Sequence, residues 1–356
     1  MKISINMSQP GKLVSVVKLR ALWVGIIALP IQVCYFSIFY LGFKTGTPTN
    51  SVNLLFLILA LWCYLSYIVL LNDLADRKAD AAVGKATIER GHTLSPAFLG
   101  ILLALLVGTS TGVILLELHG DIVFDLLWLI AYVMGTLYSI PPVSLKNRGL
   151  AGFLTDSVIE KPLPILIIFA YFNYYGFEII LFPLIGELLD SVFKHQAHDY
   201  DIDVKEGLRT FAVELGKRVS DLLVKYLFDP LDALVVMLAF AVVISQIPGI
   251  RSITSLVFLL IVLGLAAVFF KSRKSIFRKG ALSWIDPRLE DHTTYTLFLN
   301  AGFQLLLLPI LGVGLATRNL NYLPLLVLLL IAILPHWLFM TKVGLVGIWK
   351  AFSLSK

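Results

Sequence analysis

The sequence predicts an all-α protein, a polytopic transmembrane helical bundle of nine to ten spans. The first observation is composition, because 58% of the 356 residues are hydrophobic and the mean hydropathy is +0.88. The second is charge, since only 15% of the residues are charged, against about 25% in a typical soluble domain. The third is the recurrence of apolar runs of about 20 residues, the length that crosses a bilayer as a helix. The chain is therefore too poor in polar residues to hold a large soluble domain.

Ten apolar runs are candidate spans. Residues 1–19 precede them as a cytoplasmic segment, and residues 342–356 follow them as a cytoplasmic tail. The first run is longer than the apolar core of a signal peptide, so we expect it to be retained as a span. The ten runs cover residues 20–42, 52–71, 94–117, 122–141, 150–172, 175–194, 229–247, 252–270, 293–316 and 321–341.

The basic residues orient these spans. With ten spans both termini lie on one side, and 25 of the 29 Lys and Arg residues lie on that side. Only Lys44, Arg251 and Arg318 lie on the opposite side, and Lys161 lies within a span. Because cytoplasmic loops carry an excess of Lys and Arg, the side of the termini is predicted to be cytoplasmic. This asymmetry accounts for the net charge of +6 without a nucleic-acid partner.

An acidic cluster follows the second span at the predicted cytoplasmic face. Its sequence is NDLADRKAD, residues 72–80. No Pro or Gly interrupts the chain before Gly84, so the helix of the span is expected to continue through the cluster. Spacings of three and four residues then place side chains on neighbouring strips of one helix face, namely those of Asn72, Asp73, Asp76 and Asp80.

A second acidic cluster, DYDID at residues 199–203, follows the sixth span at the same face. Asp199 and Asp203 are four residues apart and share a helix face, whereas Asp201 points elsewhere. Like charges at this spacing destabilise a bare helix, so a compensating cation is expected. Ligands that are all oxygen suit Mg²⁺ or Ca²⁺, and Mg²⁺ typically binds through a few carboxylates together with substrate phosphates.

Two such clusters at one membrane face indicate chemistry on a lipid diphosphate. Bridging Mg²⁺ would hold the diphosphate between the clusters and stabilise it as the leaving group when its C–O bond breaks. Departure from an allylic carbon leaves a carbocation that aromatic faces stabilise. A pocket within the bilayer excludes the water that would quench this cation.

Three motifs together resemble the UbiA superfamily of intramembrane prenyltransferases. The first cluster matches the family pattern N-D-x-x-D-x-x-x-D, and the second matches D-x-x-x-D, followed by VKEGLRTFAVELG. Between them, YSIPPVSLKNRG (residues 138–149) is similar to the family stretch Y-S-x-P-P-x-x-L-K. The resemblance covers about residues 72–216. It implies that residues 20–341 form one transmembrane prenyltransferase domain, a helical bundle around a central cavity that opens laterally to lipid.

The resemblance also implies roles for individual residues. Lys146 would contact the diphosphate directly, with Lys85, Arg90 and Arg209 as further candidates, and Tyr138 would lie near the reacting carbon or the leaving oxygen. Asp76 and Asp199 would be central to catalysis, and Asn72 would contribute to both substrate and metal binding. The residues implied to hold the Mg²⁺–diphosphate are Asn72, Asp73, Asp76, Asp80, Asp199 and Asp203.

The chain departs from the family pattern in two places. Many members have an Arg-Pro pair soon after the first cluster, whereas residues 86–90 here read ATIER without a proline. The family usually has nine spans, and ten are counted here. His195 lies four residues before Asp199, so a metal or acid–base role is open to it beside that of a solvated histidine. We assign it as the candidate group near the acceptor, where a proton finally leaves.

Several ionisable residues fall inside the predicted fifth and sixth spans. Such residues mark either an ion pair in the bundle interior or the lining of a polar cavity, and the sequence leaves both interpretations open. The fifth span holds Asp156, Glu160 and Lys161, and the sixth holds Glu187 and Asp190.

The predicted function is Mg²⁺-dependent transfer of a polyprenyl group from a prenyl diphosphate to a small acceptor inside the membrane. The acceptor that the resemblance favours is an aromatic precursor of the quinone type. Cyclisation of the prenyl diphosphate without an acceptor is an alternative, and a secondary transporter with paired acidic gates is an alternative from another class. The partners expected are the prenyl diphosphate, the acceptor and membrane lipid, with no nucleic acid and no obligate protein partner. The protein is expected to be an integral multi-pass membrane protein with its active site facing the cytoplasm.

Overall fold

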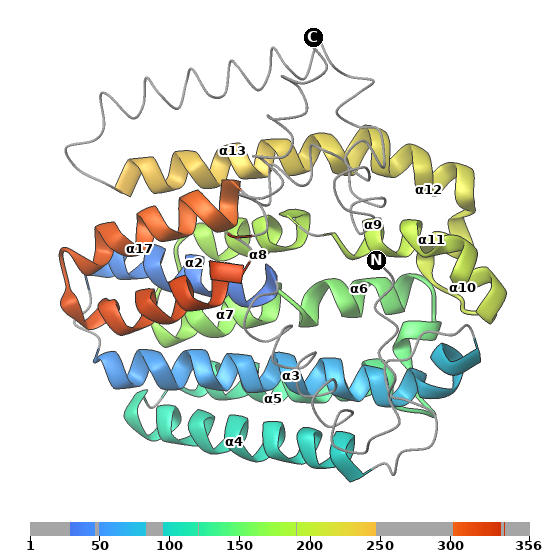
Figure 1. Cartoon of the computed structure of the whole chain (residues 1–356), viewed down its shortest axis with the longest axis horizontal. Coiled ribbons are helices and arrows are strands. Elements are labelled where there is room, and N and C mark those ends of the chain that lie inside the picture. The colour runs from blue at the N-terminus through green and yellow to red at the C-terminus, as the bar shows by residue number, and fades with distance from the viewer. Residues whose placement is uncertain are drawn as a thin grey trace. The chain divides into compact units, whose positions relative to one another are not determined.

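The structure of the protein is a computed structural model (Figure 1), which describes residues 29–46, 50–82, 95–119, 121–189, 191–246, 302–335 and 338. Within these residues every regular element is a helix, apart from one isolated bridge between Gly149 and Thr210. The predicted all-α class is therefore confirmed. The described chain forms two compact units, one up to Ile38 and from residue 50 to Asp229, the other from Phe39 to Gly46 and from Pro230 onward.

The first unit is built on three long helices. They are α3 (Ser51–Ala82), α4 (Ser95–His119) and α5 (Ile122–Ser139), and α3 packs against both of the others (Figure 1). The helices approach closely at Gly108 of α4, where an added Cβ would lie 2.4 Å from the Tyr132 Oη and 3.0 Å from the Cys63 Cβ. A side chain at this position would push α4 away from its neighbours.

The same three helices are long and apolar enough to cross a membrane, over Ser51–Arg77, Phe98–Leu115 and Ile122–Ser139. The α3 segment is 72% buried within the protein, but the other two segments are only 28% buried. Their outward surfaces carry leucine, isoleucine and valine side chains, which suit contact with lipid. A membrane fold is thus supported, whereas nine to ten spans are not confirmed, since three helices in the described part of the chain meet these criteria.

Pairs of short helices make up the regions predicted as the fifth and sixth spans. The fifth region, residues 150–172, holds α6 (Leu150–Ile159) and α7 (Pro162–Tyr171). The sixth region holds α8 (Glu178–Leu189) and the start of α9 (Val192–His198). The break before α7 has a local cause, because a proline disfavours helical backbone at the residue before it. The Lys161 φ of −129° lies outside the helical range, and Pro162 begins the next helix.

An aromatic cluster anchors the helices that follow. These helices are α10 (Tyr200–Glu206), α11 (Phe211–Leu215), α12 (Lys217–Leu223) and the π-helix η2 (Val224–Phe228). The Phe193 ring centroid lies 5.0 Å from that of Phe228 and 5.9 Å from that of Phe211, which stacks on Phe153 at 5.4 Å. The rings join α6, α9, α11 and η2, and so fix the region that carries the second acidic cluster.

The second unit contains most of α13 (Asp229–Gln246), the π-helix η4 (Gly302–Leu307), α17 (Leu308–Ala316), η5 (Leu320–Tyr322) and a helix over residues 323–335. It also takes in the end of α2 (Leu29–Thr45). A Cβ at Gly42 would lie 2.7 Å from both Leu315 and Tyr322. The Arg318 guanidinium lies 4.8 Å from the Phe43 ring centroid. Residues 252–270, predicted as the eighth span, lie outside the described residues.

Candidate active site

The first acidic cluster lies on the last turns of α3. The helix runs without a break to Ala82, so the predicted continuation of the second span through the cluster is confirmed. The Asp73 side chain is buried, and Asn72 and Asp76 are partly exposed. Asp80 belongs to the same helix, and its side chain lies outside the described part of the structure.

Lys146 reaches this cluster from the loop after α5. The residue lies in the 3-10 helix η1 (Leu145–Asn147), which follows a cis peptide bond between Pro141 and Pro142. Its Nζ donates a hydrogen bond of 3.0 Å to the Asn72 Oδ1 and forms a short ion pair with Asp76. The Ser139 hydroxyl, at the end of α5, also donates to the Asn72 Oδ1, at 3.4 Å. The structure therefore brings the YSIPPVSLKNRG motif to the first acidic cluster, although the contacting residues are about 70 residues apart in sequence.

The second cluster occupies a break between two short helices. Asp199 ends α9 and precedes α10, and its carbonyl accepts the Asp203 N–H at 2.9 Å. Asp203 is buried, and its Oδ2 accepts a hydrogen bond of 3.0 Å from the Thr210 hydroxyl. Asp201 is exposed and pairs with Lys217 of α12. The expectation that Asp201 points away from the other two carboxylates is thus met.

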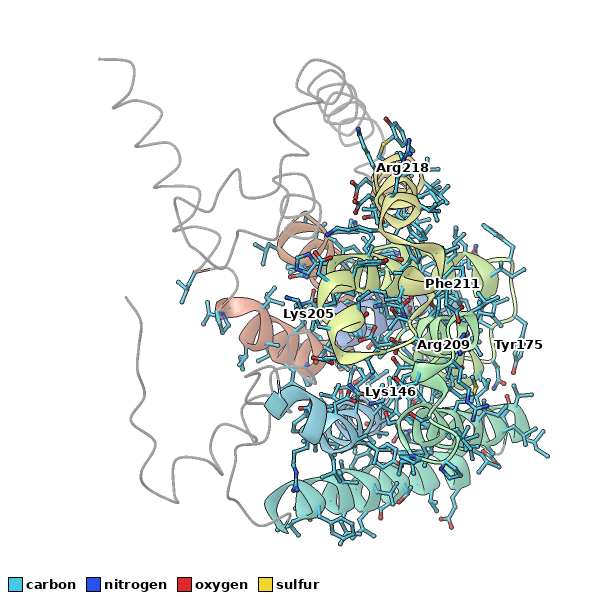
Figure 2. All side chains as sticks on the ribbon, turned by 90° about the vertical axis from the view of Figure 1, so that its right-hand side faces the viewer. Lys146, Tyr175, Lys205, Arg209, Phe211 and Arg218 are labelled. Atoms are coloured by element: carbon cyan, nitrogen blue, oxygen red, sulfur yellow. The ribbon has the colours of Figure 1, made fainter. Side chains whose placement is uncertain are left out.

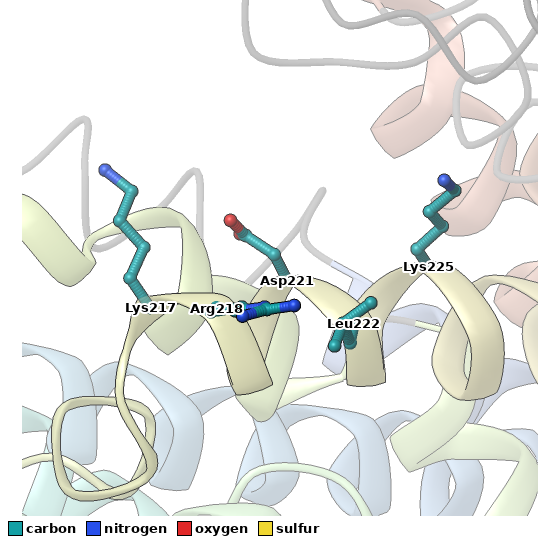
Figure 3. A pocket seen from close by; sticks show the side chains of 5 residues that line it. All are labelled: Lys217, Arg218, Asp221, Leu222 and Lys225. Atoms are coloured by element: carbon teal, nitrogen blue, oxygen red, sulfur yellow. The ribbon is translucent and has the colours of Figure 1, made fainter.

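Lys217 changes the titration of Asp201. The hydrogen bond from the Lys217 ammonium holds the pKa of the Asp201 carboxyl below its ordinary value, and the same bond raises the pKa of Lys217. Lys217 also lines a pocket of about 500 Å³ on α12 and η2, together with Arg218, Asp221, Leu222 and Lys225 (Figure 3). None of the predicted site residues lines this pocket.

A backbone contact joins the loop of Lys146 to the second cluster. The Gly149 N–H donates to the Arg209 carbonyl at 2.7 Å, within an isolated bridge between Gly149 and Thr210. The Gly149 φ of +52° suits glycine. Figure 2 shows Lys146 and Arg209 on these neighbouring segments. The chain that places Lys146 at the first cluster therefore also contacts the residue that binds Asp203, so all three motifs meet in one region.

Several predicted residues are less closely tied to this region. The Arg209 side chain is 78% exposed and lies 3.6 Å from the Glu214 carboxylate, so its contact with a diphosphate remains a prediction. His195 is exposed on α9, and its role near the acceptor is likewise untested. Lys85 and Arg90 lie outside the described residues.

Tyr138 extends the region into the membrane-spanning part of the chain. Its hydroxyl donates a hydrogen bond of 2.9 Å to the Asp156 Oδ2 of α6. Sequence reasoning named both residues but did not pair them. Ser139 and Thr210 were not named as site residues, although they directly follow the named residues Tyr138 and Arg209. Their positions beside named motif residues were the signal that could have identified them.

The side chains of the two acidic clusters offer mainly oxygen atoms as ligands. Asn72 supplies an amide oxygen, and Asp73, Asp76, Asp199 and Asp203 supply carboxylates, a set that suits a hard ion such as Mg²⁺. Among the residues that the structure describes, no three His, Cys, Asp or Glu side chains lie close enough together to hold a metal ion. Asp76 instead pairs with the ammonium of Lys146, which is itself a compensating cation.

The fold and the site define a class: a helical membrane protein with two carboxylate clusters gathered where its apolar helices end. The UbiA prenyltransferase family matches residues 33–285, about 70% of the chain. The protein therefore belongs to the UbiA family of prenyltransferases, as the three motifs indicated, and this membership favours an enzyme over the transporter alternative.

One solved structure supports the fold. A UbiA homologue from Archaeoglobus fulgidus, bound to DMAPP and Mg²⁺, is 18% identical with a TM-score of 0.51, over 83% of this chain and 98% of that one. A structure described as a digeranylgeranylglyceryl phosphate synthase is 14% identical with a TM-score of 0.47, over 84% of this chain and 98% of that one. No curated protein sequence matches the chain.

Proposed function

We propose that the protein transfers a prenyl group from a prenyl diphosphate to an acceptor within the membrane, in a Mg²⁺-dependent reaction. The observation that carries this proposal is the position of Lys146. The Lys146 ammonium contacts Asn72 and Asp76. In the same loop, the Gly149 N–H donates a hydrogen bond to the segment that carries the second cluster. A cation beside carboxylate and amide oxygens, at the end of an apolar helix, suits the head group of a lipid diphosphate.

The residues of the chain would bind and orient the diphosphate. Asp76 and Asp203 approach from the two clusters, and Asn72, Asp73, Asp80 and Asp199 complete the proposed ligand set for Mg²⁺. Bound Mg²⁺ would supply charge neutralisation to the departing diphosphate. The Lys146 ammonium, freed from Asp76, would donate to a diphosphate oxygen as negative charge develops there. The DMAPP and Mg²⁺ bound to the Archaeoglobus fulgidus homologue support this assignment.

Apolar and aromatic side chains on α3 and α5 would surround the prenyl chain. Tyr64 lies edge-on to both Trp128 and Tyr132, with ring centroids 6.2 and 5.4 Å apart. An allylic cation is stabilised by such ring faces. Exclusion of water by these side chains would favour capture of the cation by the acceptor.

We propose an aromatic precursor of the quinone type as the acceptor, because its ring π electrons attack the cation without prior deprotonation. The excess of Lys and Arg on one side of the predicted spans supports a cytoplasmic site, where a water-soluble aromatic acid has access. Partners are then the prenyl diphosphate, this acceptor and membrane lipid.

The test uses the full chain in nanodiscs with geranylgeranyl or farnesyl diphosphate. Diphosphate release is measured with Mg²⁺ or EDTA, alone and with a panel of hydroxybenzoate and dihydroxynaphthoate acceptors. Mg²⁺-dependent release that requires an aromatic acceptor, with a prenylated product, would support the proposal. Release without an acceptor and a cyclic hydrocarbon product would show a cyclase. Release under no condition would overturn the proposed function.

A further inference from the structure

A cluster of ionisable side chains lies beside the site and is not used in the binding of the diphosphate. The Lys161 side chain is fully buried, and its Nζ lies 2.8 Å from the Glu160 carboxylate and 3.8 Å from that of Glu187. Glu187 accepts hydrogen bonds from the Ser157 hydroxyl at 3.1 Å and the Val192 N–H at 3.0 Å. These contacts join α6 to α8 and to the start of α9 at a break between helices.

Asp156 belongs to this cluster and also faces the site. Its carbonyl accepts the Glu160 N–H at 3.3 Å, one helical turn further on, and its Oδ2 accepts the Tyr138 hydroxyl at 2.9 Å. Among the residues that the structure describes, Asp156, Glu160 and Glu187 are the carboxylates gathered near the Lys161 ammonium. Asp156 is the carboxylate of this set that a phenol hydroxyl contacts, so it is placed to receive a proton through that hydroxyl.

Tyr138 connects the cluster to the reacting groups. It lies at the end of α5, and the next residue, Ser139, donates to the Asn72 Oδ1 at 3.4 Å. Tyr138 and Asp156 are both partly exposed. The Tyr138 hydroxyl therefore joins the ionisable cluster at Asp156 to the end of α5, where Ser139 contacts Asn72 of the proposed diphosphate site.

We propose that Asp156, reached through the Tyr138 hydroxyl, accepts the proton that the acceptor loses when it takes the prenyl group. This inference rests on the proposed function. The allylic C–O bond breaks with its electron pair on the diphosphate, and a ring π pair of the acceptor forms the new C–C bond. The ring C–H then breaks, and its electron pair restores aromaticity. The Tyr138 oxygen takes this proton while its own proton passes to the Asp156 carboxylate.

The step assigns a separate task to each group of carboxylates. The clusters at Asp76 and Asp203 promote ionisation, whereas Asp156 completes the reaction after the new bond has formed. Glu160, Lys161 and Glu187 position Asp156 and set the charge around it. Loss of Asp156 should therefore leave ionisation largely intact and impair product formation. A ring intermediate that cannot lose its proton reverts to the free acceptor and the allylic cation. Water then captures this cation as the prenyl alcohol.

The experiment separates these two events. Wild type, Asp156→Asn and Tyr138→Phe are assayed in nanodiscs with geranylgeranyl diphosphate, Mg²⁺ and the aromatic acceptor that turns over in the assay above. Released diphosphate and prenylated product are measured separately, with protonated and ring-deuterated acceptor. We expect product formation to fall about 100- to 10,000-fold in both variants, the range for loss of a general base. Diphosphate release should fall far less, and a primary deuterium isotope effect absent from wild type should appear.

The chain offers a matched control. Asp121 accepts a hydrogen bond of 2.9 Å from the Tyr175 hydroxyl at the opposite end of α5, so Asp121→Asn makes the same chemical change outside the site. It should retain coupled turnover without an isotope effect. Asp156→Glu, which keeps a carboxylate, should restore part of the product yield.

Three results would overturn the inference alone while wild type remains a coupled prenyltransferase. The first is an equal loss of diphosphate release and product in Asp156→Asn, which would indicate a structural role. The second is unchanged coupling in that variant. The third is uncoupling in His195→Gln instead. A wild-type protein that releases no diphosphate would overturn the proposed function, and the inference with it.

Discussion

The two acidic clusters hold their carboxylates in different ways. The first lies on an unbroken helix, and its Asp76 pairs with the charged Lys146. The second lies where α9 gives way to α10, and its Asp203 is hydrogen-bonded by the neutral hydroxyl of Thr210. The difference teaches that matched spacing in sequence does not imply matched local contacts, because Asp76 contacts an ammonium and Asp203 accepts a bond from a hydroxyl.

This contrast suggests an order of events in the proposed reaction. Lys146 has to leave Asp76 before it contacts a diphosphate, so the first cluster exchanges one cationic partner for others. Thr210 has no charge to exchange and is able to keep its hydrogen bond to Asp203 throughout. The first cluster should therefore be more sensitive to changes of charge, and the second more sensitive to changes of geometry.

Removal of a cluster carboxylate should have the largest effect. We expect Asp76→Asn to lower turnover by about 1,000-fold and Asp199→Asn by about 100-fold, the two ends of the range for loss of one strong electrostatic contact to the transition state. Turnover is measured as Mg²⁺-dependent diphosphate release in nanodiscs, after size-exclusion chromatography has shown that each variant is inserted and monodisperse. Full activity in both variants would contradict the Mg²⁺–diphosphate site.

Lys146→Met tests the charged partner of the first cluster. Loss of a charge-assisted hydrogen bond costs about 1.5–3 kcal/mol, so we expect KM for the prenyl diphosphate to rise about 10- to 100-fold. Because Lys146 and Asp76 are in contact, the double variant with Asp76→Asn should lose less than the sum of the two single effects. Lys205→Met on α10 is the control, since Lys205 is exposed and has no assigned role (Figure 2). Equal effects of the two lysine changes would show that Lys146 acts only through general charge.

The sequence was most informative where a local rule applied. The absence of Pro and Gly before Gly84 predicted that α3 would continue through the first cluster, and it does. The spacing of the second cluster predicted that Asp201 would turn away from Asp199 and Asp203, and Lys217 binds it there. Three motifs in order predicted the family, which the match over residues 33–285 confirms.

Long-range contacts were beyond these rules. The hydrogen bond between Gly149 and Arg209 joins backbone groups 60 residues apart, and neither side chain predicts this contact. The pairing of Tyr138 with Asp156 depends in the same way on how α5 packs against α6. The break before Pro162 had a visible cause, whereas the break at Asp199 had none in the form of proline or glycine.

Thr210→Val tests the neutral partner of the second cluster. The change keeps the shape of the side chain and removes the hydroxyl that donates to Asp203. A neutral hydrogen bond contributes about 1 kcal/mol, so turnover should fall about fivefold. Thr109→Val is the control, because Thr109 is an exposed residue of α4 whose hydroxyl donates to the Leu105 carbonyl. A loss as large as that of Asp76→Asn would show that the two clusters depend on their partners equally.

The smallest effect is expected at Asp201, the carboxylate that faces away from its cluster. Its pKa is lowered by the hydrogen bond from Lys217, so its stabilising contribution is present above the unfolded-state pKa of about 3.9 and is lost as the pH falls through the lower folded-state value. Asp201→Asn should therefore lower the thermal stability slightly at pH 6–7, and the two proteins should converge below about pH 4.

Activity should separate Asp201 from the carboxylates on either side of it. Diphosphate release by Asp201→Asn, and by Lys217→Met, should stay close to that of wild type, because this pair is exposed and belongs to neither proposed ligand set. The stability difference is followed by thermal melting in detergent from pH 3 to pH 7. A large loss of turnover with no change in melting would move Asp201 into the site, and the second cluster would then use all three of its carboxylates rather than two.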